Sequence, residues 1–269
     1  MKKSLISLLM AGAMVLSLNY SVEAKGNQQK SATTLSVGVN PVPHGELLEL
    51  IKDDLAAQGI DLKIVVFTDY VQPNSALLQG DLDANYFQTI PYLESSEEWK
   101  NALSFIWAVH VEPYGLYSEK YKNINDIPNG ATIAINNDPA NEGRALLLLQ
   151  ANGLITLAPN SGLRATPQDI TVNPKNLKFR ELEAAQLPRA LPDVDAATIN
   201  GNYALEAGLN PVKDSLAIEG AESPYANGLV VKKGTENDPR FEALKKVLLS
   251  QKVKDYINSH YNGGVVATF

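Results

Sequence analysis

Apolar and polar residues in the first third of the chain alternate between strand-like and helix-like patterns. Residues 34–39 (TLSVGV) and 61–67 (DLKIVVF) are short runs rich in β-branched residues, which are typical of strands. Residues 44–59 place leucine and isoleucine at helical spacing and end at a glycine. A second helix over 73–80 and a strand over 81–87 follow. This βαβαβ order favours a parallel sheet with right-handed crossovers.

The alternation restarts after about residue 120 and predicts a second α/β unit. Short apolar runs predict strands over residues 131–136, 176–182, 195–200, 215–220 and 227–234. Helices are predicted over residues 141–153 and, as a long amphipathic segment, over residues 239–261. Together with the first series, this pattern predicts two α/β units in one chain.

The N-terminal segment has the pattern of an export signal. Two lysines precede an apolar stretch over residues 5–18. Val22 and Ala24 then provide small residues at the two positions that a signal peptidase recognises. The apolar stretch is too short to span a membrane as a helix. We therefore predict a signal peptide over residues 1–24, a polar disordered leader over residues 25–33, and export to the periplasm or cell envelope.

The chain contains no cysteine, which removes several kinds of chemistry. Disulfides, thiolate metal sites, a cysteine nucleophile and a lipid-modified cysteine at the mature N-terminus are not expected. The formal net charge of −7 gives no support for binding to nucleic acid or to an anionic membrane. We therefore expect no nucleic-acid partner.

Catalytic signatures are also missing from the sequence. It has no Gly-x-Ser-x-Gly elbow, no His-Glu-x-x-His pair and no Walker loop. His44, His110 and His260 are scattered and share no metal-ligand spacing. We therefore expect no metal, no cofactor and no enzymatic activity. One alternative of another class stays open, a secreted hydrolase of small substrates that uses Asp81 and Asp83 as acid and base.

One cation lies where a helix disfavours positive charge. Asp138 and Pro139 are typical of a helix start, and Arg144 follows within about the first turn. Exposed backbone N–H groups and the helix dipole make that position favourable for anions. Arg144 therefore needs an anion beside it. Either a ligand carboxylate or a protein carboxylate such as Glu142 could supply the charge.

Amide and aromatic side chains near predicted strand ends complete the candidate site. The amides are Asn141, Asn200 and Asn227. The aromatic residues are Tyr70, Phe87 and Tyr92. Arginine binds a carboxylate through two hydrogen bonds, and asparagine carbonyls can accept from an ammonium group. Ligands of parallel-sheet folds bind at the carboxyl ends of strands, so these residues suggest a site for an apolar zwitterion.

Long blocks of the chain closely resemble the methionine-binding lipoproteins of ABC methionine importers. The blocks are NDPANEGRALLLLQANGLI, NPKNLKFRELEAAQLPRAL, INGNYALEAGL, ESPYAN and DYVQPNSALLQGDLDANYFQTIPYL. The resemblance runs from about residue 35 to the C-terminus. It implies an α/β, two-lobed periplasmic-binding-protein fold in which each lobe is a mostly parallel sheet flanked by helices. It also implies that residues 34–115 and 228–269 form one lobe and residues 116–227 the other.

The same resemblance implies the ligand and the partners. Arg144 would pair with the carboxylate of L-methionine or a close analogue, the three amides would hold its polar end, and the three aromatic residues would line its side chain. The protein would be a monomer that delivers the ligand to the permease and ATPase subunits of an ABC importer.

Two departures from the family leave alternatives open. The chain lacks the cysteine at which such proteins are lipidated, and it has Thr89 where the family often has histidine. The second change alters the wall of the side-chain pocket. D-methionine, a methionine-containing dipeptide or another apolar amino acid therefore stay open as ligands. A different function also stays open, that of a surface interaction protein that has kept the fold but lost transport.

Overall fold

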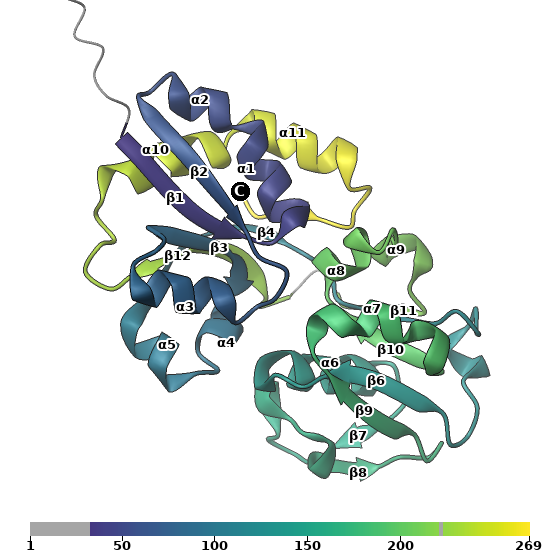
Figure 1. Ribbon diagram of the computed structural model, residues 1–269. Coiled ribbons are helices and arrows are strands. Elements are labelled where there is room, and N and C mark those ends of the chain that lie inside the picture. The colour runs from purple at the N-terminus through teal and green to yellow at the C-terminus, as the bar shows by residue number, and fades with distance from the viewer. Residues whose placement is uncertain (1–32, 221–222) are drawn as a thin grey trace, which may run out of the picture. The chain divides into compact units, whose positions relative to one another are not determined.

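Two β-sheets built from strands far apart in the sequence organise the computed structural model, which describes residues 33–220 and 223–269 (Figure 1). The predicted signal peptide over residues 1–24 and residues 25–32 of the predicted leader lie outside the described residues. Thr33, the last residue of that leader, begins the first strand. No helix in the described ranges combines the length and the apolar character that a membrane crossing requires.

The larger sheet has six strands in the order β13-β4-β12-β3-β1-β2. Its strands are β1 (Thr33–Val39), β2 (Ile60–Val66), β3 (Ala84–Thr89), β4 (Leu103–Val111), β12 (Ala226–Lys232) and β13 (Val266–Ala267). β1 pairs in parallel with β2 and β3, whereas β12 lies antiparallel between β3 and β4. Early and late segments of the chain therefore share this sheet, as the resemblance implied.

Helices cover both faces of the six-stranded sheet (Figure 1). One face packs against α1 (Glu46–Leu50), α2 (Lys52–Ala56), α10 (Pro239–Leu248) and α11 (Gln251–His260). The other face packs against α3 (Gln72–Gln79), α4 (Ile90–Leu93) and α5 (Glu97–Ala102). Burial on both sides explains why β1 and β3 consist largely of buried residues.

Two helices expected to be continuous are broken. The helix predicted over residues 44–59 is divided at Ile51, whose φ of −108° and ψ of 3° interrupt the helical backbone between α1 and α2. The helix predicted over residues 239–261 is divided into α10 and α11 by extended backbone at Ser250. Apolar periodicity is preserved across both breaks, so the pattern could not reveal them.

The second sheet has five strands in the order β11-β5-β10-β6-β9. Its strands are β5 (Gly115–Tyr117), β6 (Thr132–Asn136), β9 (Lys178–Leu182), β10 (Ala196–Ile199) and β11 (Ala217–Ile218). The associated helices are α6 (Pro139–Ala151), α7 (Leu187–Ala190), α8 (Gly201–Glu206) and α9 (Pro211–Asp214). α6 packs against one face, and α7 and α8 pack against the other. A separate antiparallel pair joins β7 (Thr156–Leu157) to β8 (Ile170–Val172).

The predicted two-unit α/β fold is confirmed, but both sheets are mixed rather than mostly parallel. β5 runs antiparallel to β10, and β12 runs antiparallel to β3 and β4. Each of these strands is the first one the chain enters after passing from one sheet to the other. A helix crossover within one sheet makes its two strands parallel, and no such crossover precedes β5 or β12.

The strand memberships also bear on the predicted lobe boundaries. The chain leaves the six-stranded sheet after Val111 and re-enters it at Ala226. Gly115, expected at the end of lobe 1, pairs in the five-stranded sheet, and Asn227, expected at the end of lobe 2, pairs in the six-stranded sheet. The division into residues 34–115 plus 228–269 and 116–227 stays a prediction.

Candidate functional site

A pocket with about 20 Å³ of free space is lined by residues from both sheets and their connections. All seven candidate residues from the sequence line it, together with five others: Gln88, Thr89, Glu112, Gly201 and Asn202. The structure therefore brings the predicted aromatic and polar residues together around one cavity.

One end of the pocket is an aromatic wall, formed by Tyr70, Phe87 and Tyr92. Phe87 lies in β3, Tyr92 lies in α4, and Tyr70 follows β2. Their ring centroids are 5.6–5.9 Å apart. The Tyr92 hydroxyl also donates to the Tyr70 carbonyl oxygen at 3.0 Å. The wall is therefore held together by its own contacts and offers an apolar surface to a side chain.

A second group of lining residues, which we call the polar end, comprises Glu112, Arg144, Asn202 and Asn227. Arg144 lies in α6 and is 5% exposed. Its Nε donates to Oε1 of Glu219 at 3.1 Å, and its Nη2 donates to the other oxygen of Glu219 and to the Glu112 carbonyl oxygen. The protein carboxylate that was left open as one source of the charge beside Arg144 is therefore present, but it is Glu219 rather than Glu142. Glu219 lies 75 residues further along the chain, so no local pattern could reveal it.

The Arg144 guanidinium is nevertheless not fully occupied. Within residues 33–220 and 223–269, its Nη1 makes no hydrogen bond to the protein. The rings of Tyr114 and Tyr225 lie 4.9 and 4.1 Å from its central carbon, so the group is held by aromatic contacts as well. One nitrogen of Arg144 therefore has no hydrogen-bond partner in the described part of the chain.

The amides of Asn141 and Asn200 are largely engaged with each other. Asn200 accepts from Asn136 and donates to Asn141, both at 2.9 Å. Asn141 in turn donates to the Asp138 carboxylate at 3.0 Å. This chain ties the ends of β6, α6 and α8 together. Both asparagines line the pocket, and their contact with a ligand stays a prediction.

Asn202 and Asn227 present donors rather than acceptors to the pocket. Oδ1 of Asn202 accepts from the Tyr70 hydroxyl at 2.6 Å, and its buried Nδ2 has no partner within the described part of the chain. Oδ1 of Asn227 faces the ring of His44 at 3.2 Å. The polar end therefore offers amide N–H groups, which suit a carboxylate. Asn202, two residues after Asn200 in the INGNY block, was not among the predicted site residues.

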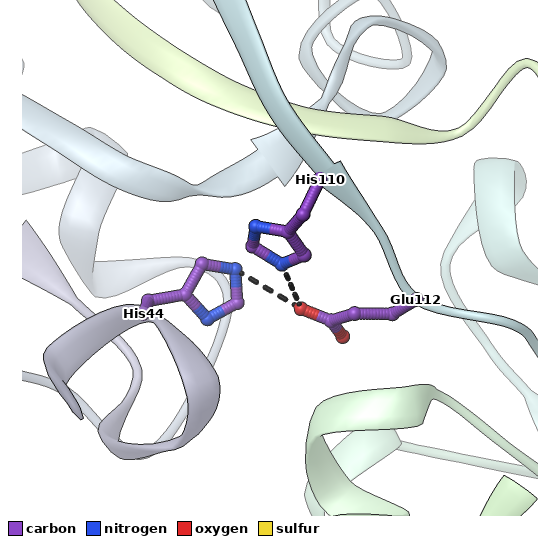
Figure 2. Close-up of side chains that lie close together, drawn as sticks. All are labelled: His44, His110 and Glu112. Atoms are coloured by element: carbon purple, nitrogen blue, oxygen red, sulfur yellow. Dashed lines mark hydrogen bonds and ion pairs between the residues drawn. The ribbon is translucent and has the colours of Figure 1, made fainter. Parts of the chain in front are cut away.

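Glu112 is the most important residue that the sequence reasoning missed. It is 5% exposed, and its Oε1 lies 2.7 Å from Nε2 of His110 and 3.3 Å from Nε2 of His44 (Figure 2). Its Oε2 accepts from the Asn202 backbone N–H at 2.8 Å. Burial favours the neutral acid, but the two histidines and this N–H outweigh burial and lower the pKa of Glu112. An ionised carboxylate therefore borders the pocket.

The expectation that the histidines are scattered is wrong for two of them. His44 and His110 are brought together with ring centroids 5.1 Å apart. With Glu112 they form a buried set of metal-ligating side-chain types whose atoms lie within 4.8 Å of one another. His44 follows β1 and His110 lies in β4, so only the strand order of the sheet could bring them together. The HVE spacing over residues 110–112, with its two side chains on one face of a strand, was the available signal.

Asp81 and Asp83, the acid and base of the hydrolase hypothesis, do not line the pocket. Asp81 is exposed, and Asp83 binds Ser36 at 2.8 Å and Arg240 at 2.9 Å. Asp83 therefore links β1 to α10. Neither aspartate lines the pocket, which leaves the hydrolase reading without its acid and base.

Comparison with known proteins identifies the same family as the resemblance of the sequence blocks. A family described as NlpA lipoprotein matches residues 35–269. The methionine-binding lipoprotein MetQ of Bacillus subtilis is 39% identical, with 96% of this chain and 97% of that protein covered. The D-methionine-binding lipoprotein MetQ of Escherichia coli is 38% identical, with 95% of each covered. A nutrient binding protein of Burkholderia cenocepacia, solved bound to methionine, superposes with a TM-score of 0.84 at 45% identity, covering 87% of this chain and 100% of that chain.

Proposed function

The chain belongs to the NlpA lipoprotein family, and from that premise we propose that it captures methionine in the pocket and delivers it to an ABC importer. The observation that carries the proposal is the division of one pocket into an aromatic wall and a polar end. A thioether side chain fits the first surface, and an amino-acid zwitterion fits the second.

Each charged group of the ligand has a counterpart at the polar end. The ligand carboxylate binds Nη1 of Arg144 and the side-chain N–H groups of Asn202 and Asn227. The ligand ammonium faces the ionised Glu112 carboxylate. Pairing is needed here because an unpartnered charge in a buried site is costly. Asn141 and Asn200 support this end through their hydrogen bonds to Asp138 and Asn136.

Ligand binding couples the two sheets. Phe87 and Asn227 belong to the six-stranded sheet, whereas Arg144 and Asn202 belong to helices of the five-stranded sheet. A ligand that contacts both sets favours the arrangement in which they lie close together. No bond is made or broken in this cycle, so we propose a binding protein rather than an enzyme.

The proposed function also implies where the protein acts. Export by the predicted signal peptide would bring the protein to the periplasm or cell envelope, where it docks as a monomer on the permease of an importer driven by its ATPase subunits. Its relatives are named lipoproteins, but the 269 residues contain no cysteine to carry a lipid.

Isothermal titration calorimetry of the purified protein tests the ligand. We expect L-methionine to bind with one-to-one stoichiometry and methioninol, which lacks the carboxylate, to bind at least tenfold more weakly. D-methionine, glycyl-methionine and leucine separate the remaining ligand classes. Absence of heat with all five compounds, together with a thermal melting temperature that none of them raises, would refute methionine capture.

A further inference from the structure

His44 lies next to the polar end of the pocket and contacts two of its residues. It belongs to the turn Pro41–Gly45 after β1, and it is 1% exposed. Its Nε2 lies 3.2 Å from Oδ1 of Asn227 and 3.3 Å from Oε1 of Glu112 (Figure 2 shows the ring and the carboxylate). His44 itself does not line the pocket, so any effect on the ligand must pass through a neighbour.

The Glu112 contact determines which nitrogen of His44 carries the proton. An ionised carboxylate oxygen only accepts hydrogen bonds, so its position 3.3 Å from Nε2 favours the tautomer with the hydrogen on that nitrogen. Burial lowers the pKa of His44 to about 4, so the ring is neutral and carries a single hydrogen. Because Nε2 is a donor, the Asn227 atom beside it must be the amide oxygen.

A second histidine holds the carboxylate that imposes this arrangement. Oε1 of the ionised Glu112 accepts from Nε2 of His110 at 2.7 Å, and Nδ1 of His110 lies 2.6 Å from the Tyr86 hydroxyl oxygen. Oε2 of Glu112 is held by the Asn202 N–H at 2.8 Å. One hydrogen-bonded chain therefore runs from the core of the six-stranded sheet to a residue that lines the pocket.

We propose that His44 is a positioning residue that orients the Asn227 amide, so that its N–H₂ group faces the ligand carboxylate. The inference rests on the proposed function. An asparagine side chain can present either its oxygen or its nitrogen, and only the nitrogen attracts a carboxylate. Asn227 lies at a register irregularity of β12, next to Gly228, so its side chain depends on such a partner for its orientation.

The same three side chains are also the types that bind zinc. Hydrogen bonding accounts better for their geometry, because both ring nitrogens approach one carboxylate oxygen at 2.7 and 3.3 Å. Each of these contacts has a donor hydrogen and an acceptor lone pair. Zinc binding is therefore treated as a competing outcome of the experiment.

The experiment measures methionine affinity in two genetic backgrounds. His44→Leu removes the donor at similar volume and should weaken L-methionine binding by about tenfold. His44→Gln retains an N–H at the position of Nε2 and should restore affinity to within about threefold. His260→Leu, at a half-exposed histidine far from the pocket in sequence, is the matched control and should bind as wild type does. In an Asn227→Ala background, His44→Leu should have no further effect.

The preference for a carboxylate gives a second measurement. Wild type should favour methionine over methioninol by a larger ratio than His44→Leu does, because the variant no longer holds the Asn227 donor in place. A merely structural role would weaken both ligands equally. Equal weakening, or the same loss from His44→Leu with and without Asn227, would overturn the proposal.

Nitrogen-15 NMR of the wild-type histidine rings tests the proposal if a variant does not fold. His44 should be a neutral Nε2–H tautomer, and an Nδ1–H tautomer would overturn the proposal. One equivalent of zinc held at the cluster, found by native mass spectrometry, would overturn it as well. Wild-type protein that binds no methionine would refute the proposed function, whereas wild-type binding with unaffected His44→Leu would refute only this inference.

Discussion

The aromatic wall of the pocket comes from Tyr70, Phe87 and Tyr92, which lie within 22 residues of one another in the sequence. The polar end comes from separate parts of the chain, joined by hydrogen bonds that span 90 residues at Glu112 and 183 residues at Asn227. The wall holds itself together by ring contacts, which tolerate small displacements. The polar end depends on donors and acceptors in register, so losing one partner affects the others.

The largest expected effect is the loss of Arg144. Arg144→Ala removes the only guanidinium that lines the described pocket and should weaken methionine binding by about a hundredfold or more, or roughly 2–5 kcal/mol. Arg144→Lys should recover part of this affinity, because a point charge cannot make the same contacts. Calorimetry on protein whose fold is checked by circular dichroism gives the answer.

Arg144→Ala should also reduce stability, because it leaves Glu219 without its partner. Glu219→Gln separates the two effects, since it disturbs the ion pair but keeps the guanidinium. If Arg144→Ala binds methionine within about threefold of wild type, the ion pair with Glu219 is the whole role of Arg144.

The next largest effect is the pH dependence of stability that the buried His44 causes. The pKa of His44 is lowered by burial from 6.5 to about 4. As pH falls from 6.5 to 4, the unfolded chain gains a proton that the folded protein does not bind, so the free energy of unfolding falls by up to about 3 kcal/mol. The raised pKa values of Glu142 and Glu206, each about 7 through burial, act in the opposite direction between pH 7 and 4.5.

The informative quantity is therefore the difference between wild type and His44→Gln in how the free energy of unfolding changes with pH. Denaturant unfolding at pH 7, 5 and 4 should show the variant losing less stability than wild type as the pH falls. Parallel pH profiles for the two proteins would mean that His44 is protonated in the fold.

The aromatic wall should have a smaller effect on binding than the polar end. Phe87→Ala removes one ring and should weaken methionine binding by about tenfold, because sulfur–aromatic contacts contribute roughly 0.3–1.5 kcal/mol beyond burial. The preference for methionine over leucine should shrink in the same variant. Competition calorimetry with both amino acids measures it, and unchanged affinity for both would place the ligand side chain elsewhere.

The smallest effect is expected at the contact that joins the two ends. Tyr70→Phe keeps the ring in the wall but removes the hydroxyl that donates to Asn202 at 2.6 Å. A single neutral hydrogen bond contributes about 1 kcal/mol, so methionine affinity should fall by roughly fivefold or less. A loss as large as that of Arg144→Ala would show that the wall and the polar end act as one unit.

Local periodicity predicted the elements whose neighbours in sequence are also their neighbours in structure. β1, β6 and α6 were found within one or two residues of their observed bounds. β4 was missed, because its partly buried middle, residues 104–108, lacks the alternation that marks a strand with one buried face. Without this strand, the sequence could not indicate that His110 lies beside His44 or that Glu112, two residues further on, accepts from it.

For the site, the sequence and its family resemblance identified seven pocket residues but not how they are paired. Asp138 capping α6 and Arg144 in its first turns follow from residues a few positions apart, so the sequence alone determined them. The Glu219 partner of Arg144, the meeting of His44 with His110, and the orientation of Asn227 were decided by the tertiary structure. Hydrogen bonds need atoms within about 3.5 Å, and over separations of 66 to 183 residues only the packing of the sheets sets that distance.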